Sequence, residues 1–127
     1  MTETYKATTS PENFKKMKYK KMLKKSQKPY AMIAICMQRH PNESVPVVEE
    51  TNAIACAVQN IWLSAHAYDI GMYWSSPKYA YGESMAKYLN LKEGESCLGF
   101  IFMGYHRAPE LPAKRTSIED KVEWVRG

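Results

Sequence analysis

A long run of apolar and small residues at positions 49–70, EETNAIACAVQNIWLSAHAYDI, constrains the fold of this chain more than any other segment. Glu49 and Glu50 at its start suit the positive end of a helix dipole, and Gly71 after it is a residue type that commonly ends helices. Between these residues, apolar or small side chains lie nearly all round the predicted helix. We therefore expect the helix to be buried, either inside one domain or between two subunits.

Three further segments predict β-strands. Residues 30–37, YAMIAICM, form an apolar run between Pro29 and the polar QRHP, which predicts a strand buried on both faces. Residues 97–105, CLGFIFMGY, form a second long apolar run and predict a buried strand, and residues 72–74 predict a short one. Because sheets commonly have about four to six strands, part of the sheet or of the core is expected to come from elsewhere.

Most of the positive charge lies at the N-terminal end of the chain. Residues 1–30 hold nine lysines and two glutamates, a formal charge of +7, whereas residues 31–127 hold nine Lys or Arg and eleven Asp or Glu, a charge of −2. Ser10 and Pro11 predict the start of a lysine-rich helix at residues 13–28. Its aromatic residues are not regularly interleaved, so we interpret it as a solvated face that binds no nucleic acid; a basic nucleic-acid-associated protein is the weaker alternative.

The remaining segments complete one domain. Residues 1–10 lack periodicity and are expected to form a tail, followed by a single domain at residues 11–127. Residues 83–89 predict a short helix, and Thr116 with Glu119 fits a capping box that begins a terminal helix. Ile118, Val122 and Val125 line one face of that terminal helix. The alternation of helices and strands predicts either three-layer α/β packing or an α+β sheet with helices on its faces.

The spacing of the cysteines and histidines does not indicate a metal site. Cys36, Cys56 and Cys97 are widely separated, without a C-x-x-C motif, and the chain has no H-x-x-x-H pair. We expect three reduced thiols inside buried elements of a cytoplasmic protein. The chain also lacks a G-x-S-x-G motif and a glycine-rich phosphate loop, although spacing alone does not exclude a catalytic triad.

The apolar segments do not indicate a membrane protein or a secreted one. No apolar run reaches the roughly 18 residues that span a bilayer. The start of the chain lacks the basic and apolar regions of a secretory signal. We therefore expect no membrane partner.

Two short segments are candidate binding sites. Trp74, Ser75 and Ser76 end a predicted strand and enter a loop, where free backbone N–H groups would let a planar ligand approach. Lys114 and Arg115 are adjacent cations before a predicted helix, and such a pair can bind a phosphate. Taken singly, an ordinary turn and a solvated pair of cations are the simpler interpretations.

Several motifs occur in a fixed order over about residues 30–125. The long helix carries Gln59-Asn60, and a Gly-x-x-Trp strand follows at residues 71–74. A turn at residues 89–95 then leads into an apolar strand ending in Gly104, and Arg115 precedes the terminal segment. In this order and spacing, the sequence resembles the FMN-dependent nitroreductase family.

The resemblance implies an α+β, three-layer fold with a central mixed or antiparallel sheet flanked by helices. It also implies a homodimer with the helix at residues 49–70 in its interface, and hydride transfer from NAD(P)H through FMN to a nitroaromatic or quinone-type acceptor. Trp74, Ser75 and Ser76 match the segment beside the isoalloxazine ring. Arg115, with Lys114 as a weaker second, matches the basic residue near the FMN phosphate. No catalytic side chain is implied, because the flavin carries the chemistry.

The sequence departs from the family's pattern on its N-terminal side. It lacks the Arg-Arg-Ser-x-Arg phosphate motif and the Pro-Ser-x-x-Asn-x-Gln-Pro-Trp segment. The chain is therefore expected to be a truncated form, equivalent to the C-terminal two-thirds of such a protein, with half of the FMN site missing. The alternative to an active oxidoreductase is a catalytically incomplete remnant that dimerises or pairs with a full-length paralogue.

Overall fold

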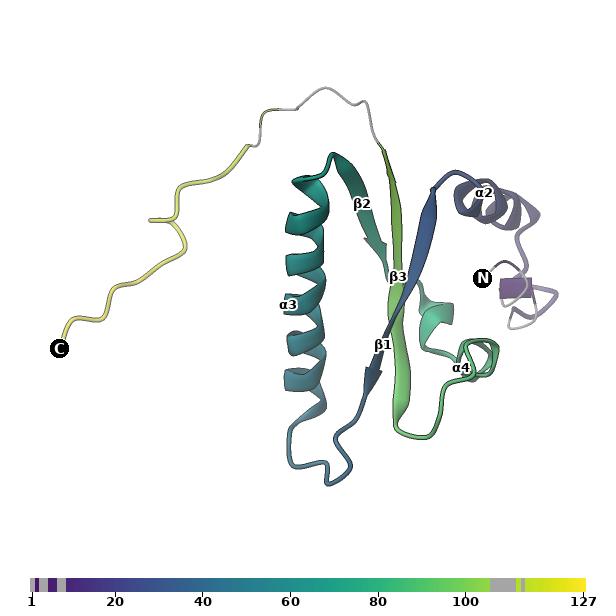
Figure 1. Cartoon of the computed structure of the whole chain (residues 1–127), viewed down its shortest axis with the longest axis horizontal. Helices are drawn as coiled ribbons and strands as arrows, with labels where there is room; N and C mark the ends of the chain where they lie inside the picture. Colours follow the sequence, from purple (N-terminus) through teal and green to yellow (C-terminus); the bar gives the residue numbers. More distant parts are fainter. Residues whose placement is uncertain (1, 3–4, 7–8, 106–111, 113) are drawn as a thin grey trace.

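The computed structural model describes residues 2, 5–6, 9–105, 112 and 114–127. Its main elements follow one another along the chain as α2 (Lys16–Ser26), β1 (Ala31–Gln38), α3 (Val47–His66), β2 (Ile70–Ser75), the 3-10 helix η1 (Lys78–Tyr81), α4 (Glu83–Tyr88) and β3 (Glu95–Tyr105) (Figure 1). The three strands form one sheet in the order β1-β3-β2. The central strand β3 pairs antiparallel with both of its neighbours.

Helices cover both faces of this sheet. The connection between the two outer strands is α3, which lies along one face, whereas η1 and α4 pack against β3 on the other (Figure 1). The result is a three-layer α+β arrangement, which confirms the predicted fold class. The sheet is antiparallel throughout the described residues, so the alternative of α/β packing is not what this chain forms.

Two clusters of buried side chains fill the spaces on either side of the sheet. The cluster beneath α3 contains Ile35, Met37, Val58, Leu98 and Ile101. The cluster beneath η1 and α4 contains Ala80, Met85, Cys97, Phe100 and Phe102. Because successive strand residues point to opposite faces, β3 contributes to both clusters. The predicted buried strand at residues 97–105 is therefore confirmed.

The central strand has an irregularity at Gly99. Strand pairing passes from Ile35 opposite Gly99 directly to Cys36 opposite Cys97, so that Leu98 has no partner on β1. Gly99 has a φ of 135°, a conformation that residues with a side chain rarely adopt. Such a bulge resets the alternation of side chains along the strand, which places Leu98 and Ile101 in the same cluster.

The prediction that the first strand is buried on both faces is wrong. In β1 only Ile35 and Met37 are buried, while 46% of Met32 and 40% of Ile33 remain exposed. The reason is the position of β1 at the edge of the sheet, with one long side unpaired. A continuous apolar run is typical of a central strand, but it does not itself specify the strand order.

The long helix differs from the prediction at its end and in its burial. It ends at His66, and Gly71 lies within β2 opposite Gly104 rather than after the helix. The turn between them has Asp69 at a φ of 57°, which Asp tolerates better than most residues. Only Val58 and Ala65 of α3 are buried. Within the part of the chain that the structure describes, the rest of the helix is half-buried or exposed.

The exposure of β1 and α3 also changes the environment of the cysteines. Cys97 is buried as predicted, but Cys36 on β1 and Cys56 on α3 are exposed. The prediction of three buried thiols is therefore wrong for two of them.

The N-terminal helix is shorter than predicted. It begins at Lys16, and the Ser10 region instead forms a turn in which the Asn13 N–H donates to the Ser10 carbonyl at 3.0 Å. No residue of α2 is buried, in keeping with a solvated lysine-rich face. Tyr5, in the segment expected to be a tail, is only 4% exposed, and its ring lies 6.4 Å from that of Tyr79. This part of the segment therefore packs on the domain.

The predicted terminal helix does not form. In residues 114–127 the structure has only a turn, closed by a hydrogen bond from the Lys121 N–H to the Ile118 carbonyl at 2.9 Å. The predicted capping contact is replaced by one from the Glu119 N–H to the Ser117 Oγ at 3.2 Å. Val125 is 92% exposed. Short helices need tertiary packing of an apolar face, and this segment has no such contact.

Candidate functional site

The predicted ring-binding segment lies where β2 leaves the sheet. Ser75 is the last paired residue of this strand, opposite Phe100. Ser76 Oγ donates to the Leu98 carbonyl at 2.8 Å. The indole of Trp74 packs against the core cluster beneath α3. These three residues at the end of β2 are thus held against β3.

Gly99 makes this close contact possible. A Cβ on Gly99 would lie 2.6 Å from the Ser75 carbonyl oxygen, 2.7 Å from Ser76 Oγ and 2.8 Å from Trp74 Nε1. Contacts that short do not occur, so only glycine allows β3 to lie against the three predicted site residues. Gly99 was not among the predicted site residues, although an isolated glycine inside an apolar strand signals a bulge or a close backbone approach.

Trp74 Nε1 is a buried donor without an acceptor among the residues that the structure describes. Leaving a buried donor unpaired costs about 1–3 kcal/mol, and such groups in native proteins usually have a partner. An acceptor from a bound molecule or from another chain would remove this cost. This orphaned donor distinguishes the Trp74 segment from an ordinary turn.

A pocket of about 480 Å³ adjoins β2 and β3 next to the end of α2. Its lining residues are Lys25, Lys28, Pro29, Gly71, Met72, Tyr73, Phe102, Met103, Gly104 and Tyr105. Of these, the paired residues Tyr73 and Phe102 lie on the face of the sheet opposite the Trp74 indole and α3. Lys25 Nζ lies 4.1 Å from the centroid of the Tyr73 ring and 5.1 Å from that of Phe102. An apolar pocket with aromatic walls and a cation favours a planar, negatively charged ligand. This pocket could not be predicted from the sequence, because its residues come from three separate elements.

Lys114 and Arg115 are not brought to the Trp74 segment. Both are exposed, and neither makes a hydrogen bond or an ion pair with the part of the chain that the structure describes. The segment from residue 114 onward runs outward beyond α3, away from the sheet (Figure 1, yellow). The predicted phosphate-binding pair and the predicted ring-binding segment therefore do not form one site within this chain.

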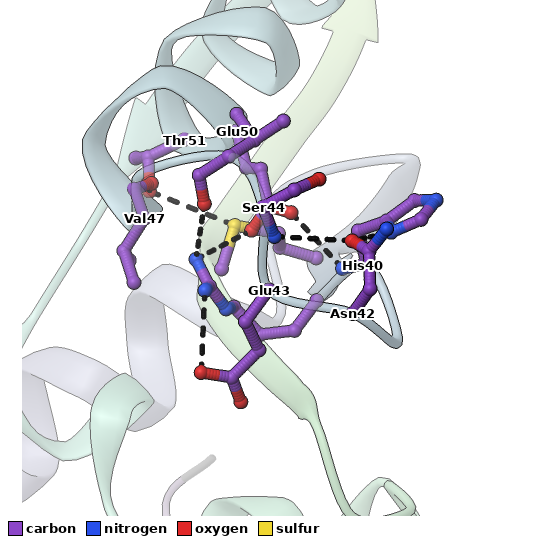
Figure 2. Close-up of polar contacts among 10 residues, drawn as sticks. His40, Asn42, Glu43, Ser44, Val47, Glu50 and Thr51 are labelled. Atoms are coloured by element: carbon purple, nitrogen blue, oxygen red, sulfur yellow. Dashed lines mark hydrogen bonds and ion pairs between the residues drawn. The ribbon is translucent and has the colours of Figure 1, made fainter.

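A network of polar contacts fixes the start of α3 on the sheet (Figure 2). Arg39 Nη1 donates to Glu50 Oε2 at 2.8 Å and to the Val45 carbonyl at 3.2 Å, and the His40 N–H donates to Glu50 Oε1 at 2.9 Å. The Arg39 and Glu50 side chains are only 17% and 13% exposed. Glu50 was predicted only to favour the helix dipole, and its role as the acceptor for the preceding loop is a tertiary feature.

Two titratable groups among the described residues have shifted pKa values. Burial raises the pKa of Tyr79, which contacts the second core cluster. Cys36 is exposed as a residue, but partial burial of its thiol, together with the neighbouring Cys97 and Glu95, raises its pKa. Within residues 2, 5–6, 9–105, 112 and 114–127, no group of three His, Cys, Asp or Glu side chains is placed to hold a metal ion. No helix in these ranges has both the length and the apolar character that a membrane crossing requires.

Comparison with known proteins gives one consistent result. A family model described as the Nitroreductase family matches residues 3–105. The solved structure of a nitroreductase-like family protein from Bacillus cereus is 26% identical, with a TM-score of 0.70, and the match covers 90% of this chain and 63% of that one. No curated protein matches.

Two further solved structures share the fold at lower identity. A mutant of an FMN and NADPH-dependent nitroreductase from sphigopyxis sp. strain HMH is 13% identical, with a TM-score of 0.60, over 85% of this chain and 50% of that one. A nitroreductase with bound FMN from Desulfitobacterium hafniense DCB-2 is 17% identical, with a TM-score of 0.52, over 88% of this chain and 61% of that one. The chain thus spans less than two thirds of the length of all three.

Proposed function

Because this chain belongs to the Nitroreductase family, we propose that it contributes to a flavoprotein oxidoreductase that transfers hydride from NAD(P)H through FMN to a nitroaromatic or quinone-type acceptor. The observation that carries this proposal is the unpaired donor of Trp74 above Gly99. Two structural neighbours support FMN as the cofactor, since one has FMN bound and the other is an FMN and NADPH-dependent enzyme. FMN supplies the hydride-transfer chemistry when it is bound.

The residues at the end of β2 fit the ring of such a cofactor. The flavin ring carries carbonyl oxygens and ring nitrogens that accept hydrogen bonds, which is the group that Trp74 Nε1 lacks. Ser75 and Ser76 would position the backbone at this edge, because Ser76 is tied to Leu98. In this proposal, Trp74, Ser75 and Ser76 bind and orient the ring, and none of them transfers a proton.

The phosphate end of the cofactor fits less completely. Lys114 and Arg115 remain the proposed phosphate-binding pair, but they extend away from β2 in the single chain (Figure 1). For them to bind the phosphate, the segment from residue 114 onward must pack over the site when the cofactor or another subunit binds. Adjacent Arg and Lys side chains would then supply a bidentate contact and a point charge.

The outer face of α3 is the proposed dimer interface. Ala53, Ala57, Asn60, Ser64 and Ala67 are exposed small or short residues that recur every three or four positions. Next to them, Ile61 and Leu63 leave 44% and 60% of their surface exposed. A continuous stripe of this kind is typical of a close helix–helix contact, and a second copy would cover these exposed apolar residues. We propose a homodimer formed through α3, acting in the cytoplasm.

The alternative proposal is a catalytically incomplete chain that pairs with a full-length paralogue. Its support is the coverage of 63% or less of the similar structures, together with the separation of the two predicted cofactor-binding segments. In this case the outer face of α3 would bind the paralogue, and the paralogue would supply the rest of the cofactor site.

The two proposals differ in the cofactor that the purified chain retains. We expect the chain to retain FMN after gel filtration and to oxidise NAD(P)H in the presence of a nitroaromatic compound. Replacing Trp74 by Phe removes one hydrogen bond and should weaken FMN binding by about tenfold, which corresponds to roughly 1.4 kcal/mol. Tyr88→Phe is the control, because it also removes one polar hydrogen from an aromatic side chain, and Tyr88 is 67% exposed on α4, outside the site. If FMN binds only after a full-length paralogue is added, the alternative holds.

A further inference from the structure

Two of the three cysteines lie opposite each other on neighbouring strands of the sheet. Cys36 on β1 is the direct partner of Cys97 on β3 in the antiparallel pairing. Residues opposite each other in such a pair have Cα atoms about 4.5–5.5 Å apart. Disulfides bridge Cα separations of about 4.4–6.8 Å. The backbone therefore already holds these two residues at a separation that a disulfide can span.

The two side chains also interact with each other. Cys97 is close enough to Cys36 to raise the pKa of its thiol, and the Cys97 thiol itself donates to the Gly99 carbonyl at 3.6 Å. The third cysteine, Cys56, is on α3, which covers the other face of the sheet. Cys56 is therefore not part of the pair.

One member of the pair is accessible and the other is not. Cys36 is exposed, whereas Cys97 is only 3% exposed. A pocket of about 220 Å³ adjoins Cys36, lined also by Met37, Gln38, Leu91 and Glu95. A small reagent can therefore reach Cys36 first, and Cys97 is then the nearest internal thiol.

We propose that Cys36 and Cys97 form a dithiol site that reacts with low-molecular-weight disulfides. The Cys36 thiolate attacks one sulfur of the small disulfide, forms a mixed disulfide and releases one thiolate, which takes up the proton that Cys36 lost. The Cys97 thiolate then attacks Cys36 Sγ, breaks the mixed disulfide and releases the second small thiol. In total, two cysteine thiols are oxidised to one intramolecular disulfide, and the small disulfide is reduced to two thiols.

The surroundings of Cys36 make this reaction slow at neutral pH. Partial burial of its thiol raises the pKa of Cys36, and the two neighbouring titratable groups, Cys97 and Glu95, add to the effect because each is negative when ionised. The thiolate is the reacting species, so the rate should increase about tenfold per pH unit below the pKa of Cys36. The other side chains that line the adjoining pocket, Met37, Gln38 and Leu91, do not titrate.

The test uses the folded chain with oxidised glutathione as the small disulfide. In a Cys56→Ser variant, we expect a product that has lost the mass of two hydrogens, and a cross-linked peptide that joins residues 36 and 97. In the matched Cys36→Ser, Cys56→Ser variant, this loss of mass should not occur. Circular dichroism before the reaction shows that both variants remain folded, which is expected because both replaced residues are exposed.

Three results would overturn the proposal. They are a mixed disulfide on Cys36 that persists without closing, a disulfide between two chains, and a Cys36 that alkylating reagents modify but glutathione disulfide does not. As a further check, the unmutated chain oxidised in denaturant should favour the nearer pair Cys36 and Cys56, since shorter loops close at lower entropic cost. Selective pairing of Cys36 with Cys97 would then be a property of the fold.

Discussion

The indole nitrogen of Trp74 lies above Gly99 so closely that a Cβ there would be 2.8 Å from it. This contact joins the end of β2 to the bulge of β3 and places the unpaired donor of Trp74 at the predicted ring-binding segment. A backbone feature of one strand thus determines the position of a side chain on its neighbour.

Replacing Gly99 by Ala should destabilise the domain by about 2–4 kcal/mol, because the new Cβ meets three atoms and the φ of 135° is strained for Ala. Urea unfolding followed by circular dichroism measures this change. Gly82→Ala is the matched control, since a Cβ there meets only the Tyr79 carbonyl oxygen at 3.7 Å. Equal effects at the two glycines would contradict the close packing at Gly99.

Replacing Glu50 by Gln should cost about 1–3 kcal/mol of stability, because Arg39 would keep its charge in a mostly buried position without its carboxylate partner. Glu49→Gln removes the same charge from the same helical turn but from an exposed residue. We expect that control to change stability by less than about 0.5 kcal/mol. The comparison fails if both variants have the same urea midpoint.

The pocket beside α2 should bind a planar aromatic anion, and the fluorescent probe anilinonaphthalene sulfonate provides a direct titration. Lys25→Ala removes the cation above Tyr73 and Phe102, so the affinity should fall about two- to fivefold. Lys20→Ala removes an equal charge from α2 outside the pocket and should leave the affinity unchanged. An equal loss in both variants would indicate general charge attraction in place of a defined pocket.

The proposed α3 interface predicts that Ala57→Arg will convert a dimer into a monomer, because a long charged side chain cannot fit a close helix contact. Light scattering after gel filtration gives the mass of the particle. Tyr88→Arg is the control, since Tyr88 lies on α4, on the other side of the sheet. A wild-type chain that is already monomeric at high concentration would show that α3 does not mediate self-association.

Stability should decrease at alkaline pH under reducing conditions. Burial raises the pKa values of Cys36 and Tyr79 in the folded chain. The unfolded chain therefore ionises first, and the folded chain remains neutral at these residues. Their contribution to stability is present below the unfolded pKa values and is lost as the pH rises through the folded ones.

The loss of stability due to the Cys36 thiol begins near pH 9, which is the ordinary pKa of a cysteine thiol. The loss due to the Tyr79 phenol begins near pH 10, the ordinary pKa of a tyrosine. Urea midpoints measured from pH 8 to above pH 10 should fall, and Cys36→Ser should flatten the first part of the curve. A Cys36→Ser variant with the same slope as the wild type would show that the thiol does not contribute.

The order of the elements could be predicted from local patterns. The apolar run at residues 97–105 predicted β3 within two residues of its observed start, and the short helix at residues 83–89 matches α4. The first segment is a continuous apolar run that follows a clear turn, and the second is a short segment between breaks, so local physical chemistry is sufficient to specify them. The resemblance to a known family, and not local chemistry, predicted the α+β fold with a mixed or antiparallel sheet.

Properties that depend on distant residues could not be predicted. An apolar run has the same sequence whether it becomes a central or an edge strand, which is why the exposure of β1 was missed. The terminal helix was predicted from the cap and the periodicity of residues 116–125. It does not form, because no neighbour among the described residues covers its apolar face. A local pattern specifies what a segment favours, and burial depends on which other segments reach it.

The candidate site divides in the same way. The sequence by itself determined that Trp74, Ser75 and Ser76 end a strand, because strand and turn preferences act between neighbouring residues. Only the tertiary structure decided that Gly99 lies against them and that Cys36 lies opposite Cys97. It also decided that Arg39 binds Glu50. The segment that holds Lys114 and Arg115 lies away from the Trp74 segment, which is likewise a property of the tertiary structure. The contacts of Gly99 and the pairing of Cys36 with Cys97 arise when β3 inserts between β1 and β2, which brings together residues that are remote along the chain.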